Sequence, residues 1–305
     1  MSTITTTSQS ATSSPLRRLI KRHPLVAFFV LAFAGSWIMF LPVLLARNGV
    51  GLLPFTLPVD SFQAIAAFTG PTLAAFIVTA ATSGAAGLRQ LLRRIVQWRV
   101  GLGWYLLALL GFPLIYVGTG VIALGVASLP TLLAQWSLLF TVYFPYVLVN
   151  LISTMGEEIG WVGYALPTLQ QRVAPLLAAA TLGAFWGLWH LPSFFISGGA
   201  QSGFSPVFFT FFLVEAIMTR ITWSWVFNKT KGSVLIIALL HAASNGTAIA
   251  LIPRLFPVTP PGAVLLTLAL ILVVFPVLII IFTRGRLSYK PDRVAQPAEA
   301  SLTQG

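Results

Sequence analysis

The sequence contains no cysteine, and this absence removes several chemistries at once. A disulfide framework, a thiol nucleophile and a cysteine-based zinc site are all excluded. Charge is also scarce, because 8% of the residues are charged against about 25% in an average soluble domain. The chain of 305 residues is instead 57% hydrophobic, with a mean hydropathy of +0.91. This composition excludes a soluble globular domain.

Several apolar runs reach the roughly 20 residues that a helix needs to cross the hydrocarbon core of a bilayer. We therefore predict an all-α, polytopic integral membrane protein with about eight transmembrane helices. Residues 1–23 are predicted to be a disordered, basic N-terminal segment, residues 24–283 the membrane domain, and residues 284–305 a polar tail. The predicted spans are Pro24–Ala46, Phe62–Ser83, Trp104–Ser128, Trp136–Pro167, Ala174–Phe195, Val207–Phe227, Gly232–Ile252 and Gly262–Phe282.

Two local features add detail to these spans. The segment Arg89–Arg99 mixes arginines with large apolar side chains, which is typical of a helix lying on the membrane surface. Pro145 falls inside the fourth predicted span, where it predicts a kink.

The basic residues predict the orientation of the chain. With eight spans, 16 of the 18 Lys and Arg residues fall on one side, and only Arg47 and Arg254 fall on the other. Basic residues concentrate on the cytoplasmic side of membrane proteins, so both termini are expected in the cytoplasm of a multi-pass cell-membrane protein. The net charge of +12 is explained by this distribution, and no nucleic-acid partner is expected.

Acidic residues are rarer still, and two of the six are adjacent within the fourth predicted span, at Glu157 and Glu158. A charged side chain at the centre of a membrane helix costs about 2.5–3.5 kcal/mol on insertion scales. Such a pair either is a structural pair held by hydrogen bonds or belongs to a functional site. Since adjacent residues point about 100° apart around a helix, one of the two is expected to act and the other to support it.

Three further polar residues lie inside predicted spans: His190, His241 and Asn245. Glu158 and His190 are each sixteen residues from position 174, so a hairpin of the fourth and fifth spans brings them to similar depth. His241 lies nine residues after Gly232, which is about 13 Å along a helix. All of these groups are therefore expected to meet in the cytoplasmic half of the membrane.

The residue types fit hydrolysis of an amide bond by either of two routes. In the first, a carboxylate and an imidazole take a proton from water and return it to the leaving amine, while His241 and Asn245 support the oxyanion. In the second, Glu157, His190 and His241 hold a zinc ion that keeps one position for water. The residues leave both routes open.

Three motifs in this order resemble those of the CAAX prenyl protease and bacteriocin-processing (Abi) family of intramembrane endopeptidases. They are Glu157-Glu158, Trp186-x-x-x-His190 and His241-x-x-x-Asn245, with matching flanks at Gly160–Pro167 and Trp186–Pro192. The resemblance covers about residues 140–250. It implies that Glu157 and His190 activate water and that His241 and Asn245 support the oxyanion or bind substrate. It also implies a peptide or protein substrate, lipidated or anchored in the membrane, cleaved near the cytoplasmic face.

The sequence departs from the family at one position, since the first motif of the family ends in Arg and Val162 stands there. Glu158 is then either neutral, because burial favours an uncharged carboxyl, or paired with a cation from another segment, Arg172 or Arg220. Two other functions remain as alternatives. Val162 favours a non-catalytic immunity or scaffold member of the same family. Ionisable groups within spans also occur in the proton relays of transporters.

Overall fold

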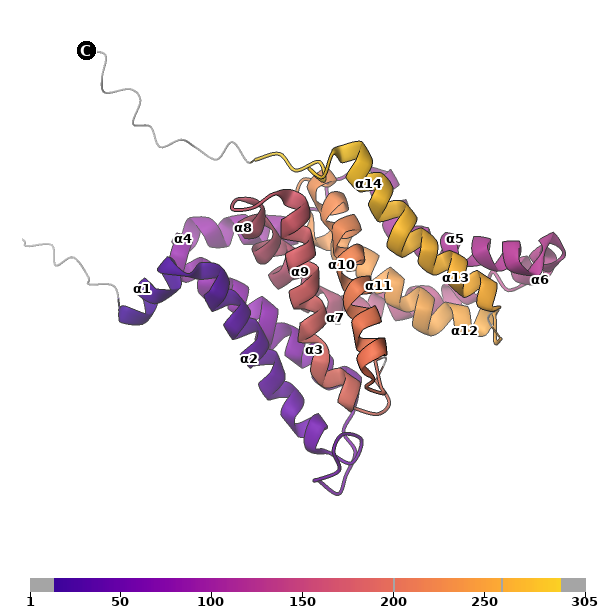
Figure 1. Ribbon diagram of the computed structural model, residues 1–305, viewed down its shortest axis with the longest axis horizontal. Coiled ribbons are helices and arrows are strands. Elements are labelled where there is room, and N and C mark those ends of the chain that lie inside the picture. The colour runs from indigo at the N-terminus through magenta and orange to yellow at the C-terminus, as the bar shows by residue number, and fades with distance from the viewer. Residues whose placement is uncertain (1–13, 200, 259, 292–305) are drawn as a thin grey trace, which may run out of the picture.

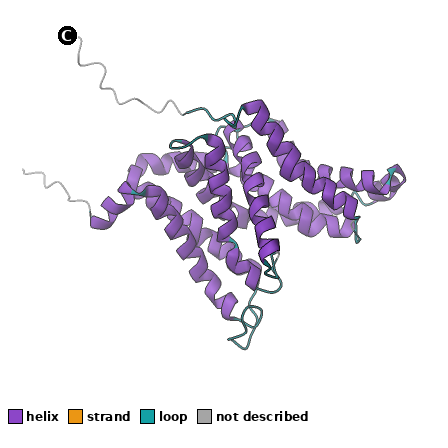
Figure 2. Cartoon of the chain, in the orientation of Figure 1, coloured by secondary structure: helices purple, strands orange, loops and turns teal. Residues whose placement is uncertain are grey.

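The computed structural model describes residues 14–199, 201–258 and 260–291, and the regular structure in these ranges is entirely helical (Figure 2). Seven segments are long and apolar enough to cross a membrane. The predicted class, an all-α polytopic membrane protein, is thereby confirmed. The seven segments are Pro24–Leu45, Val59–Ile95, Leu102–Leu124, Leu139–Gln170, Pro206–Lys229, Val234–Leu255 and Pro261–Thr283.

The fifth predicted span, Ala174–Phe195, is shorter than expected. It contains helix α9 (Pro175–Trp189), whose 15 residues extend about 22 Å, followed by a 3₁₀ turn at Leu191–Phe195. Pro192 explains this ending, because proline lacks an amide hydrogen and disfavours helical geometry at the preceding residue. Helix α9 nevertheless lies beside α10 (Pro206–Lys229) and runs in the opposite direction to it (Figure 1).

Prolines interrupt several spans, and a π-helical turn accompanies five of them, whereas Pro42 in Pro24–Leu45 and Pro113 in Leu102–Leu124 lie within α-helix. A proline inside a helix clashes with the carbonyl four residues earlier, and a wider turn at that point removes the clash. One such turn, Phe68–Thr72, contains Pro71 itself. Four more precede Pro145, Pro167, Pro253 and Pro276, namely Leu139–Tyr143, Trp161–Ala165, Gly246–Leu251 and Leu270–Val274. The disturbance predicted at Pro145 therefore takes the form of a π-helical turn.

The helix that carries the basic segment after the second span is interrupted. Helix α4 (Leu73–Ile95) is broken at Gly84, whose φ of 58° and ψ of −149° lie outside the helical region. This break falls one residue after the predicted end of the span at Ser83. Only glycine adopts such a conformation without steric cost, so Gly84 separates the membrane-crossing part of α4 from its arginine-rich part.

The N-terminal segment differs from its prediction where it is described. Pro15–Arg22 forms helix α1, and the Ser14 hydroxyl caps it by accepting a hydrogen bond from the Arg17 amide at 3.3 Å. The predictions for residues 1–13 and 292–305 lie outside the described residues. The remaining helices are α2 (Pro24–Leu45), α3 (Val59–Ala67), α5 (Leu102–Leu124), α6 (Leu129–Ala134), α7 (Phe144–Gly160), α8 (Leu166–Gln170), α11 (Val234–Asn245), α12 (Ile252–Leu255), α13 (Pro261–Ala269) and α14 (Phe275–Thr283).

The main core draws most of its buried residues from α2, α4, α9, α10, α11 and the segment Ile159–Leu169. Among the seven candidate spans, Val234–Leu255, which contains α11, is the most buried. Of its most apolar 18 residues, 67% lie inside the structure. Gly183 and Gly187, four residues apart on α9, bring this helix against α10. A Cβ atom at Gly183 would lie 2.5 Å from the Cα of Ile217, so only glycine permits this approach. Small residues at this spacing are typical of tight helix pairs in membranes.

Candidate active site

Glu158 is the centre of a buried polar cluster. Its Oε2 accepts a hydrogen bond from Nη1 of Arg220 at 2.6 Å, and its Oε1 accepts one from Nη2 at 2.9 Å. His241 Nδ1 lies 2.9 Å from the same Oε1. The side chains of Glu158 and Arg220 are both 0% exposed. Of the two alternatives that the sequence left open for Glu158, pairing with Arg220 from another helix is the one found.

Arg220 is held by aromatic rings as well as by the carboxylate. Its guanidinium carbon lies 4.1 Å from the centroid of the Trp186 ring and 5.2 Å from that of Trp223. A guanidinium can form two parallel hydrogen bonds to a carboxylate and stack on aromatic rings at the same time, which an ammonium group cannot do. Arg220 on α10 therefore fixes the position of the Glu158 side chain, which extends from α7 toward α10.

Trp186 links Glu157 to His190. Its indole nitrogen donates a hydrogen bond to Glu157 Oε2 at 2.9 Å, and its carbonyl oxygen lies 2.9 Å from His190 Nδ1. A carbonyl can only accept, so Nδ1 of His190 carries the proton. The Nε2 atom of a neutral His190 then keeps a free lone pair.

The ring of His241 is oriented by the same reasoning. Its Nδ1 faces the Glu158 carboxylate, which accepts the hydrogen bond, so Nε2 is the atom left for other chemistry. Trp186 and Trp223 enclose the ring, with centroid distances of 5.5 and 5.0 Å. Glu158 thus contacts the ring of His241 directly.

Asn245 lies one turn beyond His241 and has a partner that the sequence analysis missed. Its Nδ2 donates a hydrogen bond to Oδ1 of Asn150 on α7 at 3.0 Å. Asn150 precedes Glu157 by seven residues, or two helical turns, and therefore shares its helix face. This spacing was available in the sequence and could have identified Asn150. The bond leaves the second amide hydrogen of Asn245 unused.

Two glycines place the Glu157-Glu158 pair close to the first half of the chain. A Cβ at Gly160 would lie 2.5 Å from the backbone of Pro71, and one at Gly156 would lie 3.0 Å from the Phe68 ring. Thr72 also donates a hydrogen bond to the Gly156 carbonyl. The π-helical turn Trp161–Ala165 starts directly after Gly160. Widened turns of this kind occur often at functional sites.

The cluster is closed to solvent. Glu157 is 2% exposed, and His190 and His241 are each 4% exposed. Buried ionisable groups that are retained at such a cost indicate function when they gather in one place. The structure therefore brings Glu157, Glu158 and His241 together, joins His190 to them through Trp186, and places Asn245 one turn away.

The donor set fits a zinc ion only in part. One possible ligand atom from each of Glu157, Glu158 and His241 lies within 4.8 Å of the others, whereas the predicted set contained His190 in place of Glu158. Both oxygens of Glu158 already accept hydrogen bonds from Arg220. Catalytic zinc sites use three protein ligands and a water. Within this close group only Glu157 and His241 keep an uncommitted donor atom, and His190, whose Nε2 is free, is not part of the group. The arrangement among the described residues thus does not complete a zinc site.

Comparison with known proteins confirms the resemblance found in the sequence. Residues 136–247 match the family described as type II CAAX prenyl endopeptidase Rce1-like. A segment of 108 residues is 29% identical to "CAAX prenyl protease 2" of Methanococcus maripaludis. This similarity covers 34% of the present chain and 40% of the relative. Each predicted site residue, from Glu157 to Asn245, lies within the matched range.

Proposed function

Starting from the match of residues 136–247 to the Rce1-like CAAX prenyl endopeptidases, we propose that this multi-pass membrane protein is an intramembrane endopeptidase. The observation that carries the proposal is the connection of Glu157 to His190 through the two ends of Trp186. This connection attaches a carboxylate and an imidazole to the two ends of one tryptophan in a buried site. Such a pair can activate water for amide hydrolysis.

Glu157 is the proposed general base. One of its oxygens accepts the Trp186 hydrogen bond, and the other is left for a water molecule. The carboxylate removes a proton from this water, whose oxygen attacks the carbonyl carbon of the peptide. His190 Nε2 orients the water by accepting its second hydrogen. The proton then passes from Glu157 to the nitrogen of the leaving amine as the C–N bond breaks, which balances the step.

Asn245 and His241 are the proposed supports of the oxyanion. Asn245 has one amide hydrogen that its bond to Asn150 does not use. His241 directs its Nδ1–H to the Glu158 carboxylate, so it can donate from Nε2 only as an imidazolium. One such donor is worth about 2.7–4 kcal/mol of transition-state stabilisation in a protease. This route requires no metal.

The position of the cluster supports cleavage near the cytoplasmic face. His241 lies seven residues after Val234, the first residue of α11, which corresponds to about 10 Å along the helix. This end of α11 follows Lys229 and Lys231, on the side that the basic residues assign to the cytoplasm. The names of the family and the relative point to a prenylated, membrane-anchored protein as the substrate.

Val162 does not favour a non-catalytic protein. Val162 favoured that alternative because the first motif then lacks its cation. In the structure, Arg220 on α10 supplies a cation to Glu158. The cluster therefore keeps the charge balance that the family arrangement implies.

The substrate class can be tested with two peptides of one sequence that differ only in a prenyl group on their cysteine. The purified full chain in nanodiscs should cleave the prenylated peptide after the modified cysteine, as measured by mass spectrometry. His190→Gln serves as the control for contaminating peptidases. Cleavage of both peptides at equal rates would reject the prenyl requirement, and cleavage of neither would reject the proposed function.

A further inference from the structure

A second polar site lies at the basic end of the molecule, away from the Glu–His cluster. It is a cavity of about 440 Å³ between α4, α8, the end of α10 and the segment after α14. Pocket volumes of about 300–1,000 Å³ are usual for small-molecule sites. Cationic and amide side chains line it, among them Arg93, Arg94, Lys231, Lys290, Gln170 and Asn228.

Arg94 is engaged elsewhere, since it donates a hydrogen bond to the Gly163 carbonyl at 2.9 Å, but the other described residues that line this cavity still carry an excess of positive charge. Its lining contains two arginines and two lysines, and no Asp or Glu is among the described residues that line it. Arg93, Lys231 and Lys290 form no ion pair within the described ranges. Like charges gathered around one cavity repel each other unless an anion lies between them. The cavity therefore favours an anionic ligand.

Gln170 provides an independent observation. This residue lines the cavity, is 5% exposed, and its amide nitrogen has no hydrogen-bond partner in the part of the chain that the structure describes. A buried donor without a partner costs about 1–3 kcal/mol. Rotation of the terminal amide would turn this donor toward the cavity, where an anion oxygen would accept its hydrogen bond.

The turn that carries Lys231 has an unusual backbone. Lys231 has a φ of 58° and the following Gly232 a φ of 79°, so two successive residues lie in the left-handed region. A non-glycine residue rarely adopts this conformation, and such residues are enriched at ligand sites. The turn places the Lys231 side chain on the wall of the cavity.

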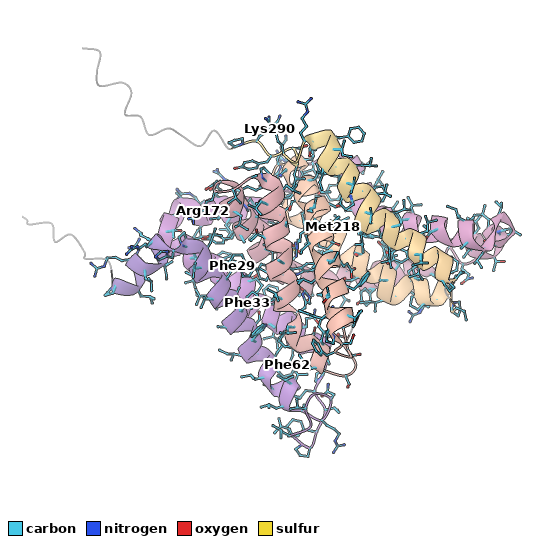
Figure 3. All side chains as sticks on the ribbon, in the orientation of Figure 1. Phe29, Phe33, Phe62, Arg172, Met218 and Lys290 are labelled. Atoms are coloured by element: carbon cyan, nitrogen blue, oxygen red, sulfur yellow. The ribbon has the colours of Figure 1, made fainter. Side chains whose placement is uncertain are left out.

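We propose that this cavity binds a phosphate group, supplied either by the headgroup of an anionic phospholipid or by a soluble phosphate compound. Phosphate oxygens accept several charge-assisted hydrogen bonds at once, which matches a lining of arginine, lysine and amide donors. Arg172 and Lys290 lie toward one end of the molecule and Phe62 toward the other (Figure 3). The basic end is the one assigned to the cytoplasm, where anionic lipids gather and basic pockets bind headgroups.

The site is separate from the proposed catalytic groups. Gln170 follows Glu158 by twelve residues, about 18 Å along a helix, on the same candidate span. Binding of phosphate is therefore measurable whether or not the protein hydrolyses peptides.

The test uses the purified full chain in a neutral detergent, titrated with dioctanoyl phosphatidylglycerol, dioctanoyl phosphatidylcholine and inorganic phosphate by isothermal calorimetry. Arg93→Gln/Lys290→Gln removes two cations from the lining. Arg89→Gln/Lys229→Gln is the matched control, because both residues are exposed, neither lines the cavity, and the loss of charge is the same. Gln170→Glu replaces the unpartnered donor by a carboxylate of the same shape.

We expect saturable binding that the lining variant weakens roughly tenfold or more, since each cation near a membrane surface contributes about 1 kcal/mol to the binding of anionic lipid. The control variant should bind as the unmodified chain does, and Gln170→Glu should abolish binding. Preference for phosphatidylglycerol over inorganic phosphate identifies a lipid headgroup, and the reverse identifies a soluble compound. Equal loss in the lining and control variants, or no saturable binding of either anion, overturns the proposal.

Discussion

Arg220 on α10 holds Glu158 on α7 by two hydrogen bonds, of 2.6 and 2.9 Å, although the residues are 62 positions apart in the chain. The family motif places a cation four residues after Glu158, where this chain has Val162, a residue that is 0% exposed. A neighbouring helix thus supplies the charge that the local sequence lacks. The pair also ties α7 to α10, so that the site and the packing of the bundle depend on the same contact.

Arg220→Leu should destabilise the protein strongly. The substitution leaves the buried Glu158 without its cation, and breaking a buried ion pair from one side costs about 3–5 kcal/mol. Thermal unfolding in detergent measures the loss. The control is Arg254→Leu, which removes an exposed arginine of α12 that forms no ion pair among the described residues. The double variant Glu158→Leu/Arg220→Leu should recover part of the loss, and equal stability of the two single arginine variants would contradict this role.

The sequence predicted the class of the fold and the elements of the site because both depend on local patterns. Apolar runs of sufficient length gave the spans, and Gly84 ends the second span where the polar composition begins. The spacing of His241 and Asn245 correctly placed them on one face of a helix. Pairings between helices carry no such local pattern, so Arg220 could be predicted only as one of two candidates for Glu158.

Two features were missed for related reasons. Helix α9 is shorter than its apolar run, because hydropathy does not register that Pro192 ends the helix within the run. Asn150 resembles an isolated polar residue in a span until the partner Asn245 is seen beside it. In both positions the outcome depends on backbone hydrogen bonding or on packing rather than on hydrophobicity.

Trp186→Phe should lower activity with little loss of stability. The change keeps an aromatic ring over Arg220 but removes the hydrogen bond to Glu157, and a bond to a charged group is worth about 1.5–3 kcal/mol. We expect kcat to fall by about 10- to 100-fold, while KM changes little. Trp161→Phe is the matched control, because the buried Trp161 indole nitrogen has no hydrogen-bond partner among the described residues. Equal kcat values for both variants would show that the bond does not orient the base.

Chelators should leave the peptidase active. In the close group of Glu157, Glu158 and His241, Glu158 is occupied by Arg220 and His241, so this group retains too few free donors for a catalytic zinc. Purified protein dialysed against EDTA should keep its rate, and elemental analysis should find zinc well below one equivalent. Loss of activity on dialysis that added zinc restores would instead assign Glu157, His190 and His241 as ligands.

Both termini should lie in the cytoplasm. The prediction follows from the 16 basic residues on one side and requires α9 to cross the membrane in spite of its 15 residues. Reporter fusions after Arg99 and Arg293 should report a cytoplasmic location, and a fusion after Gly199 an external one. An external reporter after Arg293 would mean that α9 does not cross.

The most direct measurement is the rate at which Glu157→Gln hydrolyses a prenylated peptide, compared with the unmodified chain in the same nanodiscs. Glutamine preserves the shape of Glu157 and can still accept the Trp186 hydrogen bond, but it cannot take a proton from water. The account predicts that the rate falls by about 10²–10⁴-fold, the usual contribution of a general base, with unchanged thermal stability. A Glu157→Gln protein that cleaves the peptide at the unmodified rate would contradict the assignment of Glu157 as the base.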